Sequence, residues 1–300
     1  MTSLFCRHNR LTAKCPICSK EMEAELRALA PPRPPGIRRA PAAPRAGRAS
    51  APRTGGLVTR KLARAEDDGY RNQLVPGLRA TADAERLAAA LVLAAERIEP
   101  PGPYEVVAAE PDRAQASWLA FLLALVGPDA PERQEAVVAG APRFADGQLL
   151  AVAPDELRGV AAYRQWAERA GSQEAGFTGE ADWSPQRRFA RVFERLALPG
   201  LSRATRFELL VTLGAAGVYE LEPDQLQLGS EHDATTQAAK RVLLSGDKML
   251  LERRARDLAD AGAVPLAALD RGFALWADTG ADVEPADEPP AALRSALALR

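Results

Sequence analysis

Apolar residues recur at helical spacing from about residue 80 to nearly the end of the chain. The first such segment ends at Pro100-Pro101 and carries its apolar residues three and four positions apart, at Leu87, Leu91, Val92, Ala95 and Ile98. No alternating run is long enough for a β-strand, and clusters of Val, Ile, Thr and Tyr are missing. The pattern therefore predicts an all-α fold, with a helical domain over residues 66–280.

Further helices follow from the same periodicity. The segment from about Asp112 to Val126 is apolar enough to lie at the centre of the domain. Weaker helices are expected over 131–139 and 155–170, a helix capped by Asp247 runs to about Ala261, and a final one covers 265–276. We expect core positions for Trp118, Trp166 and Trp276. Residues 281–300 are expected to form a loose tail.

The segment from Gly171 to Asp182 is predicted to be a long loop with an exposed Phe177, and long loops inside compact domains often carry function. Ser184 followed by Pro185 predicts the start of the next helix. We interpret the arginines of that helix as a solvated face; they are Arg187, Arg188, Arg191 and Arg195.

The N-terminus holds all three cysteines of the chain in a pattern typical of a metal site. Cys6 and His8 are followed by Cys15 and Cys18, which gives four soft or borderline ligands within thirteen residues. Two tight turns can bring such ligands to the corners of a tetrahedron, as structural zinc requires. We therefore predict a zinc knuckle with a short helix over residues 1–30, able to contact nucleic acid or a protein partner.

Residues 31–65 are rich in Pro, Ala and Arg and lack apolar periodicity, which predicts a disordered linker. Residues 1–64 hold 14 Lys/Arg and 3 Asp/Glu, a net charge of +11, which leaves 39 − 14 = 25 against 40 − 3 = 37, a net of −12, for residues 65–300. A cationic arm on an acidic body suits phosphate contacts with a nucleic acid, and a solubilising linker is the alternative.

No segment of the sequence predicts membrane insertion or secretion. The longest uncharged apolar run, Ala114 to Val126, is too short to span a bilayer. Arg7, His8 and Arg10 occupy positions where a signal peptide needs apolar residues. Together with a metal-type cysteine pattern, these features favour the cytoplasm.

A hairpin between two helical segments is the strongest functional feature. Leu198, Pro199, Gly200 and Leu201 form a tight turn, and Ser202 is positioned to cap the helix that follows. Because backbone N–H groups and partial positive charge gather at a helix N-terminus, such a hairpin suits a phosphate oxygen without a basic side chain.

This hairpin resembles that of the helix-hairpin-helix DNA glycosylase superfamily, which reads Leu-Pro-Gly-hydrophobic-Gly followed by Lys-Thr. Ser202 replaces the second glycine, and Ala204 stands where bifunctional members keep a Schiff-base lysine, which argues against lyase chemistry there. Asp233 resembles the catalytic aspartate of the superfamily. Its interval from the hairpin is longer than usual, so Asp224 is an alternative.

A narrower resemblance covers roughly residues 80 to 276. The hairpin, the segment Gly171–Gly179, Trp183-Ser-Pro and Ala238-Ala-Lys-Arg-Val look like the alpha-glutamyl/putrescinyl thymine pyrophosphorylases. In that glycosylase-like branch an amine or amino acid is thought to displace pyrophosphate from an activated thymine methyl. The resemblance implies a DNA-base-modifying enzyme acting on a flipped modified thymine.

Chemical roles can be assigned on that basis. A flipped base needs aromatic faces and polar edges around it, for which we predict Gln173, Phe177 and Trp183. Asp233 would stabilise a sugar cation or deprotonate an amine, and Lys240, two helical turns on, would approach phosphate. Asp233 as a plain N-cap, and His232 as a surface residue, are the structural alternatives. A monofunctional glycosylase and a noncatalytic binding module remain alternative functions.

Overall fold

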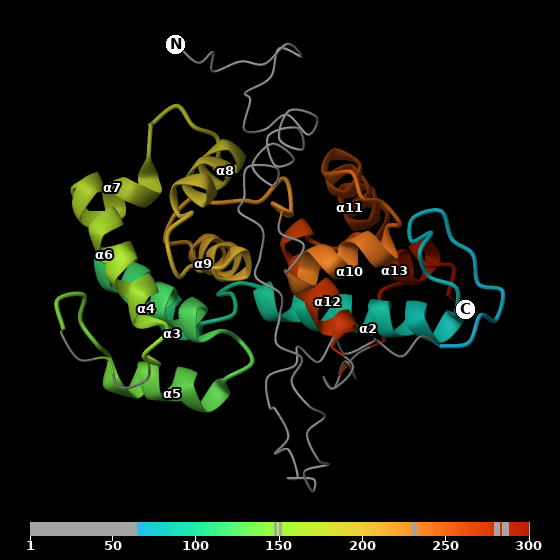
Figure 1. Ribbon diagram of the computed structural model, residues 1–300, viewed down its shortest axis with the longest axis horizontal. Helices are drawn as coiled ribbons and strands as arrows, with labels where there is room; N and C mark the ends of the chain where they lie inside the picture. Colours follow the sequence, from blue (N-terminus) through green and yellow to red (C-terminus); the bar gives the residue numbers. More distant parts are fainter. Residues whose placement is uncertain are drawn as a thin grey trace, which may run out of the picture. The chain divides into compact units, whose positions relative to one another are not determined.

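The computed structural model describes residues 65–146, 149, 152–229, 233–278, 283 and 288–299. Within these residues the chain is all-helical, with no strand, which confirms the predicted fold class (Figure 1). The helices in chain order are α2 (Thr81–Ile98), α3 (Glu105–Ala109), α4 (Arg113–Val126), α5 (Pro131–Gly140), α6 (Leu157–Ala170), α7 (Gln173–Thr178), α8 (Pro185–Arg195), α9 (Arg203–Ala215), α10 (Ala234–Val242), α11 (Lys248–Gly262), α12 (Leu266–Ala277) and α13 (Ala291–Ala296).

Helix α4 is the central element of one group of helices, as its apolar sequence predicts. Asp112 caps it by accepting hydrogen bonds from the amides of Ala114 and Gln115, and every residue from Gln115 to Val126 is buried. It packs against α9, α5, α3 and α7. This stretch has no solvent face, so apolar residues occupy nearly all of its circumference, the exceptions being Gln115 and Ser117.

The second group joins the two ends of the described chain. Helix α12 packs along α2 and also contacts α10 and α11, while α13 packs on α11 (Figure 1). Gly272 makes the α2–α12 approach possible, because a Cβ there would lie 2.5 Å from Cδ2 of Leu91. The indole of Trp276 donates to the carbonyl of Asp83 at 3.0 Å, in keeping with the predicted core position of Trp276.

The predicted loop over 171–182 is wrong in part, because residues 173–178 form helix α7. Ser172 caps it by accepting from the amide of Ala175 at 3.0 Å. Phe177 is fully buried rather than exposed, with its ring against Trp166 and Tyr219 at centroid distances of 5.1 Å each. Six residues that include a glycine are too few to show a helical period.

The predicted loose tail is also wrong where α13 forms. Leu293 and Leu297 are fully buried, and the carbonyl of Leu297 accepts from the hydroxyl of Tyr70 at 2.6 Å. The amide of Asn72 donates to the carbonyl of Ala296 at 2.8 Å. These contacts join segments more than 200 residues apart, which local sequence does not reveal.

No described helix combines the length and the apolar character that crossing a bilayer requires. The predicted zinc knuckle and the predicted linker, apart from its last residue Ala65, fall outside the described residues.

Candidate functional site

The hairpin joins α8 to α9 through a tight turn at Gly200. Gly200 has a φ of +87°, and a Cβ at this position would lie 2.7 Å from the amide nitrogen of Gly159 in α6. The amide of Leu201 donates to the carbonyl of Leu198 at 3.1 Å. Glycine is required here twice over, by the left-handed backbone and by the close approach to α6.

Ser202 caps α9 as its sequence predicts. Its hydroxyl accepts from the amide of Thr205 at 2.9 Å and lies 2.8 Å from the Thr205 hydroxyl. Two amides of the turn and first helical turn, those of Leu201 and Thr205, are therefore used by the protein itself. The amides of Arg203 and Ala204 lie in the first turn, where no intrahelical acceptor exists, so they remain the groups suited to an anion.

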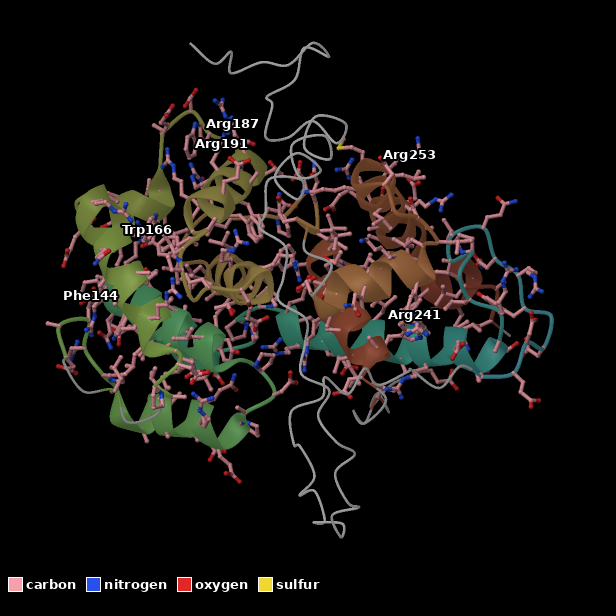
Figure 2. All side chains as sticks on the ribbon, in the orientation of Figure 1. Phe144, Trp166, Arg187, Arg191, Arg241 and Arg253 are labelled. Carbon is pink, nitrogen blue, oxygen red and sulfur yellow. The ribbon has the colours of Figure 1, made fainter. Side chains whose placement is uncertain are left out.

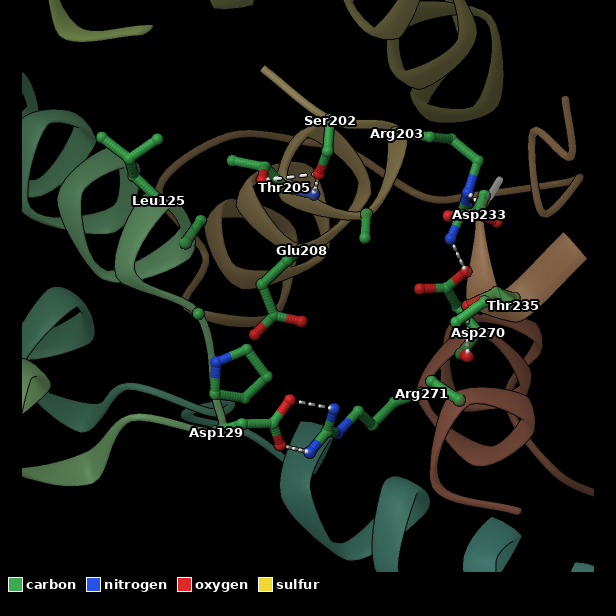
Figure 3. Close-up of a pocket in the computed structure, with 16 residues that line it drawn as sticks. Leu125, Asp129, Ser202, Arg203, Thr205, Glu208, Asp233, Thr235, Asp270 and Arg271 are labelled. Atoms are coloured by element: carbon green, nitrogen blue, oxygen red, sulfur yellow. Dashed lines mark hydrogen bonds and ion pairs between the residues drawn. The ribbon is translucent and has the colours of Figure 1, made fainter. Parts of the chain in front are cut away.

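A cavity of about 510 Å³ opens beside this helix start. It is bordered by the N-terminal ends of both α9 and α10, by the end of α4 with the turn after it, and by α12 (Figure 3). Its lining comprises Ala124, Leu125, Gly127, Pro128, Asp129, Ser202, Arg203, Ala204, Thr205, Glu208, Asp233, Ala234, Thr235, Asp270, Arg271 and Ala274. The hairpin serine and the predicted catalytic aspartate thus meet at one cavity.

Asp233 caps α10, as the structural alternative predicts, and it also lines the cavity. Its Oδ2 accepts from the amide of Thr236 at 2.8 Å and from the Thr236 hydroxyl at 2.7 Å. Nε of Arg203 lies 2.9 Å from the same oxygen but makes no hydrogen bond of good geometry, so this contact is an ion pair. The Asp233 side chain is 10% exposed. These contacts hold the carboxyl group in a fixed position.

Arg203 connects the hairpin to the acids of the cavity. It is the first residue of α9, and its side chain is 5% exposed. Besides Asp233 it contacts Oδ1 of Asp270 in α12 at 2.5 Å and donates to the carbonyl of Leu226 at 2.9 Å. One buried guanidinium therefore couples the start of α9, the start of α10, the loop between them and α12.

Asp270 is the second acid that Arg203 contacts, and it is buried. Burial raises its pKa to about 6, and Arg203 opposes that rise by stabilising the charged form. A nearby buried acid, Glu252 of α11, accepts from the amides of Leu226 and Leu228 at 2.7 Å each. Burial also raises the pKa of Glu252. The loop before Asp233 is thus held by two buried charged side chains, Arg203 and Glu252.

Two further ion pairs border the cavity. Glu208 pairs with Arg97 of α2. Asp129 in the α4–α5 turn pairs with Arg271 of α12, as Figure 3 shows. Arg271 also donates to Oδ2 of Asp129 at 3.2 Å. The cavity lining therefore contains four acids and two arginines, so its charged groups are predominantly acidic.

The structure does not bring the other predicted catalytic residues to this cavity. Lys240 belongs to α10, and Asp224 lies in the loop between α9 and α10, but neither is among the lining residues. Asp224 borders a separate hollow near α11 and α12, and its carbonyl accepts from Arg256 at 2.7 Å. Of the two candidate acids, Asp233 is therefore the one placed beside the hairpin.

The three residues predicted to hold a base are in the core instead. The amide of Gln173 donates to the carbonyl of Ala114 at 3.0 Å and accepts from the Tyr163 hydroxyl at 2.9 Å. Phe177 is fully buried against the rings of Trp166 and Tyr219, and Trp183 is 6% exposed. None of them lines the cavity of Asp233. Their roles are corrected from base recognition to packing.

The predicted zinc ligands Cys6, His8, Cys15 and Cys18 and the predicted surface residue His232 lie outside the described residues. Over the described ranges, no three His, Cys, Asp or Glu side chains are grouped to hold a metal ion.

Sequence reasoning missed Arg203 and Asp270. Arg203 lies inside the hairpin motif, whose recognisable residues are those of the turn. Asp270 is an acid that directly follows the apolar run from Leu266 to Leu269. A charged residue on an apolar helix face is a signal for a buried partner. Which partner it meets depends on packing between α9 and α12, 67 residues apart.

Comparison of the chain with protein-family models, curated protein sequences and solved structures finds no match.

Proposed function

We propose that the helical body is a DNA-base-modifying enzyme of the thymine-hypermodification type. The hairpin binds a phosphate of the DNA backbone, and the cavity accepts a modified thymine flipped out of the duplex. The observation that carries this proposal is the junction of hairpin and acid: Ser202 and Asp233 line one cavity, and Arg203 links them. The resemblance of the hairpin supplies the reaction class.

The dimensions of the cavity support a small occupant. Its volume of about 510 Å³ falls within the ~300–1,000 Å³ typical of small-molecule sites. A base must leave the stack before an enzyme can reach its methyl group, and a concave site beside a backbone-binding element meets that need. The open N-terminal amides of α9 lie at the edge of the same cavity.

Asp233 is the residue to which we assign chemistry. In the pyrophosphorylase reaction an incoming amine forms a C–N bond at the activated methyl carbon while the C–O bond to pyrophosphate breaks. The amine must lose a proton, and a fixed carboxylate is suited to orient the amine and accept that proton. The Thr236 hydrogen bonds and the Arg203 ion pair keep the carboxylate oriented without a change of rotamer.

A monofunctional glycosylase is the second candidate, and the presence of Ala204 favours it over a bifunctional one. Ala204 lines the cavity at the position of the Schiff-base lysine, and no lysine is among the described lining residues. Base excision here would therefore proceed without a covalent imine at this position. Asp233 would then stabilise the positive charge that develops on the sugar.

A noncatalytic binding module remains the third candidate, favoured by the acidic body. For the N-terminal region we propose a structural zinc ion held by the Cys/His motif, followed by a cationic arm that contacts DNA. These two features would act together, because an arm with positive charge offsets the repulsion between DNA and a body of net charge −12.

The test uses the full chain and a duplex carrying pyrophosphorylated hydroxymethyluracil together with a small primary amine. Release of pyrophosphate with a new amine-linked base supports the proposal, and an abasic product selects the glycosylase. Unchanged DNA at saturating protein, with binding retained, selects the binding module. Mass spectrometry of digested nucleosides separates all three outcomes.

A further inference from the structure

Helix α8 and the hairpin are the most cationic part of an acidic body. Residues 185–206 contain six arginines and a single acid, Glu194, whereas residues 65–300 as a whole have 25 Lys/Arg against 37 Asp/Glu. A local excess of one sign within a body of the other sign focuses the field at that surface. The contacts of these arginines determine which of them face a partner.

Two of the six arginines are committed to the interior. Arg188, which sequence reasoning placed on the solvated face, is buried and donates to the carbonyls of Thr178 at 2.8 Å and Glu220 at 3.0 Å. Arg203 is committed to Asp233 and Asp270. The remaining four, Arg187, Arg191, Arg195 and Arg206, form what we call the arginine strip.

The first three members of the strip follow one side of α8. They are spaced four residues apart, so successive side chains lie on the same helix face about 6 Å apart along the axis. Figure 2 shows Arg187 and Arg191 along α8. The guanidinium groups of Arg187 and Arg195 lie 5.8 and 4.9 Å from the ring centre of Trp183. Such stacking keeps two of the charges positioned before any partner binds.

Arg206 extends the strip onto the hairpin. It donates to the carbonyl of Phe193 at 3.1 Å and lies 4.2 Å from the Phe193 ring centre, which places it at the end of α8. Burial lowers its pKa, and the nearby charge of Arg203 lowers it further. A cation under both influences gains more than an exposed one from a new negative partner.

The strip has few acids to neutralise it. Within the described residues Arg195 and Arg206 have no carboxylate within ion-pair distance, and Arg187 reaches Asp182 only at 3.9 Å. Arg191 pairs with Glu194 at 3.1 Å, but both side chains are more than half exposed, so the pair contributes little. An extended polyanion can therefore engage all four arginines without displacing a buried ion pair.

We propose that the arginine strip is a second DNA-backbone contact surface, along which a strand held at the hairpin continues over α8. This inference deepens the proposed function, since it takes DNA as the partner. Guanidinium groups suit phosphates because they present several donors in a planar fork. The strip gives sequence-independent affinity, while the cavity of Asp233 selects the base.

The test measures DNA affinity of the full chain by fluorescence anisotropy at several salt concentrations between 50 and 200 mM. The strip variant is Arg191→Gln with Arg195→Gln, and Arg206→Gln tests the hairpin end. The matched control is the double variant Arg79→Gln with Arg294→Gln. Arg79 precedes α2, and Arg294 lies in α13. Circular dichroism verifies that every variant keeps its helices.

Each lost phosphate contact lowers the slope of log K against log salt by about 0.9, which corresponds to about eightfold in affinity at 0.1 M salt. We expect the slope to become less negative by about 2 for the strip variant and by about 1 for Arg206→Gln, and to stay unchanged for the control. If wild type binds DNA but the slope is unchanged in both the strip variant and Arg206→Gln, the proposed contact surface is wrong. It is also wrong if the control variant loses as much salt dependence as the strip variant. Absence of DNA binding by wild type overturns it as well.

These outcomes separate the strip from the proposed function. If the wild-type protein modifies thymine but the strip variant keeps wild-type salt dependence of DNA binding, only the proposed contact surface is refuted. A reduced slope in a protein that never changes the DNA supports the strip and refutes the enzyme activity.

Discussion

Replacement of Asp270 by asparagine should stabilise the protein at neutral pH. Asp270 is buried, and its carboxyl group has a pKa of about 6 in the folded protein against the ordinary value of 3.8. A folded-state pKa above the unfolded one means that the folded protein binds more protons between these pH values. Stability is therefore lost as pH rises from about 4 to about 6, and ionised Asp270 carries a cost at pH 7.

The size of that cost follows from the shift. About two pKa units at ~1.4 kcal/mol each amount to about 3 kcal/mol. Asparagine has nearly the same shape as protonated aspartate, and its oxygen can still accept from Arg203, which keeps Asp233 as a counterion. Asp270→Asn should therefore match wild type near pH 4 and exceed its free energy of unfolding by up to about 3 kcal/mol at pH 7.

Urea unfolding followed by tryptophan fluorescence at pH 4, 5, 6 and 7 measures this difference. Asp257→Asn, at an exposed position of α11, is the matched control and should stay within about 0.5 kcal/mol of wild type throughout. A difference between Asp270→Asn and wild type that does not change with pH would refute the reasoning. So would a variant that is strongly destabilised at pH 7, because it would show that the charged form of Asp270 is needed.

Three other outcomes can be checked in the same protein. In urea titrations, Gly200→Ala should lower the free energy of unfolding by more than about 2 kcal/mol, because its Cβ would collide with Gly159. Gly171 has a similar φ but open space around it, so Gly171→Ala should lower that free energy by only about 1 kcal/mol. Phe177→Ala should cost about 3–5 kcal/mol by leaving a core cavity, against under about 0.5 kcal/mol for the exposed Met249→Ala; equal costs would contradict the core assignment. Native mass spectrometry of the full chain should detect one zinc ion that a chelator removes, and a metal-free mass in zinc-supplemented protein would refute the zinc prediction.

Local signals predicted most of the helices and their starts. Ser184, Ser202, Asp233 and Asp247 were each expected to begin a helix, and each accepts a hydrogen bond from an amide of its first turn. The all-apolar helix over Asp112–Val126 was expected at the centre and is buried there. These features depend on residues three or four apart, which is the range in which sequence directly determines structure.

The site itself could be predicted only in part. The proximity of Ser202 and Asp233 was suggested by resemblance, but the partners of Arg203 come from three separate segments of the chain. The predicted base-pocket residues failed for the same reason, because aromatic side chains are suited both to a base and to a core. Only the packing of α4, α6 and α7 decides that Phe177 belongs to the core.

The most direct measurement compares Asp233→Asn with Asp247→Asn on DNA carrying the modified thymine. Both aspartates cap helices through an amide of the first turn, and asparagine caps nearly as well. Asp233→Asn also removes one of the two carboxylates paired with the buried Arg203, so it should be less stable than Asp247→Asn, and both variants are assayed at a temperature at which circular dichroism shows them folded. Asp247 is not among the residues that line the cavity of Asp233. We predict normal DNA affinity for both variants, loss of product at least a hundredfold for Asp233→Asn, and wild-type product for Asp247→Asn. Equal product from the two folded variants would contradict a catalytic role for Asp233.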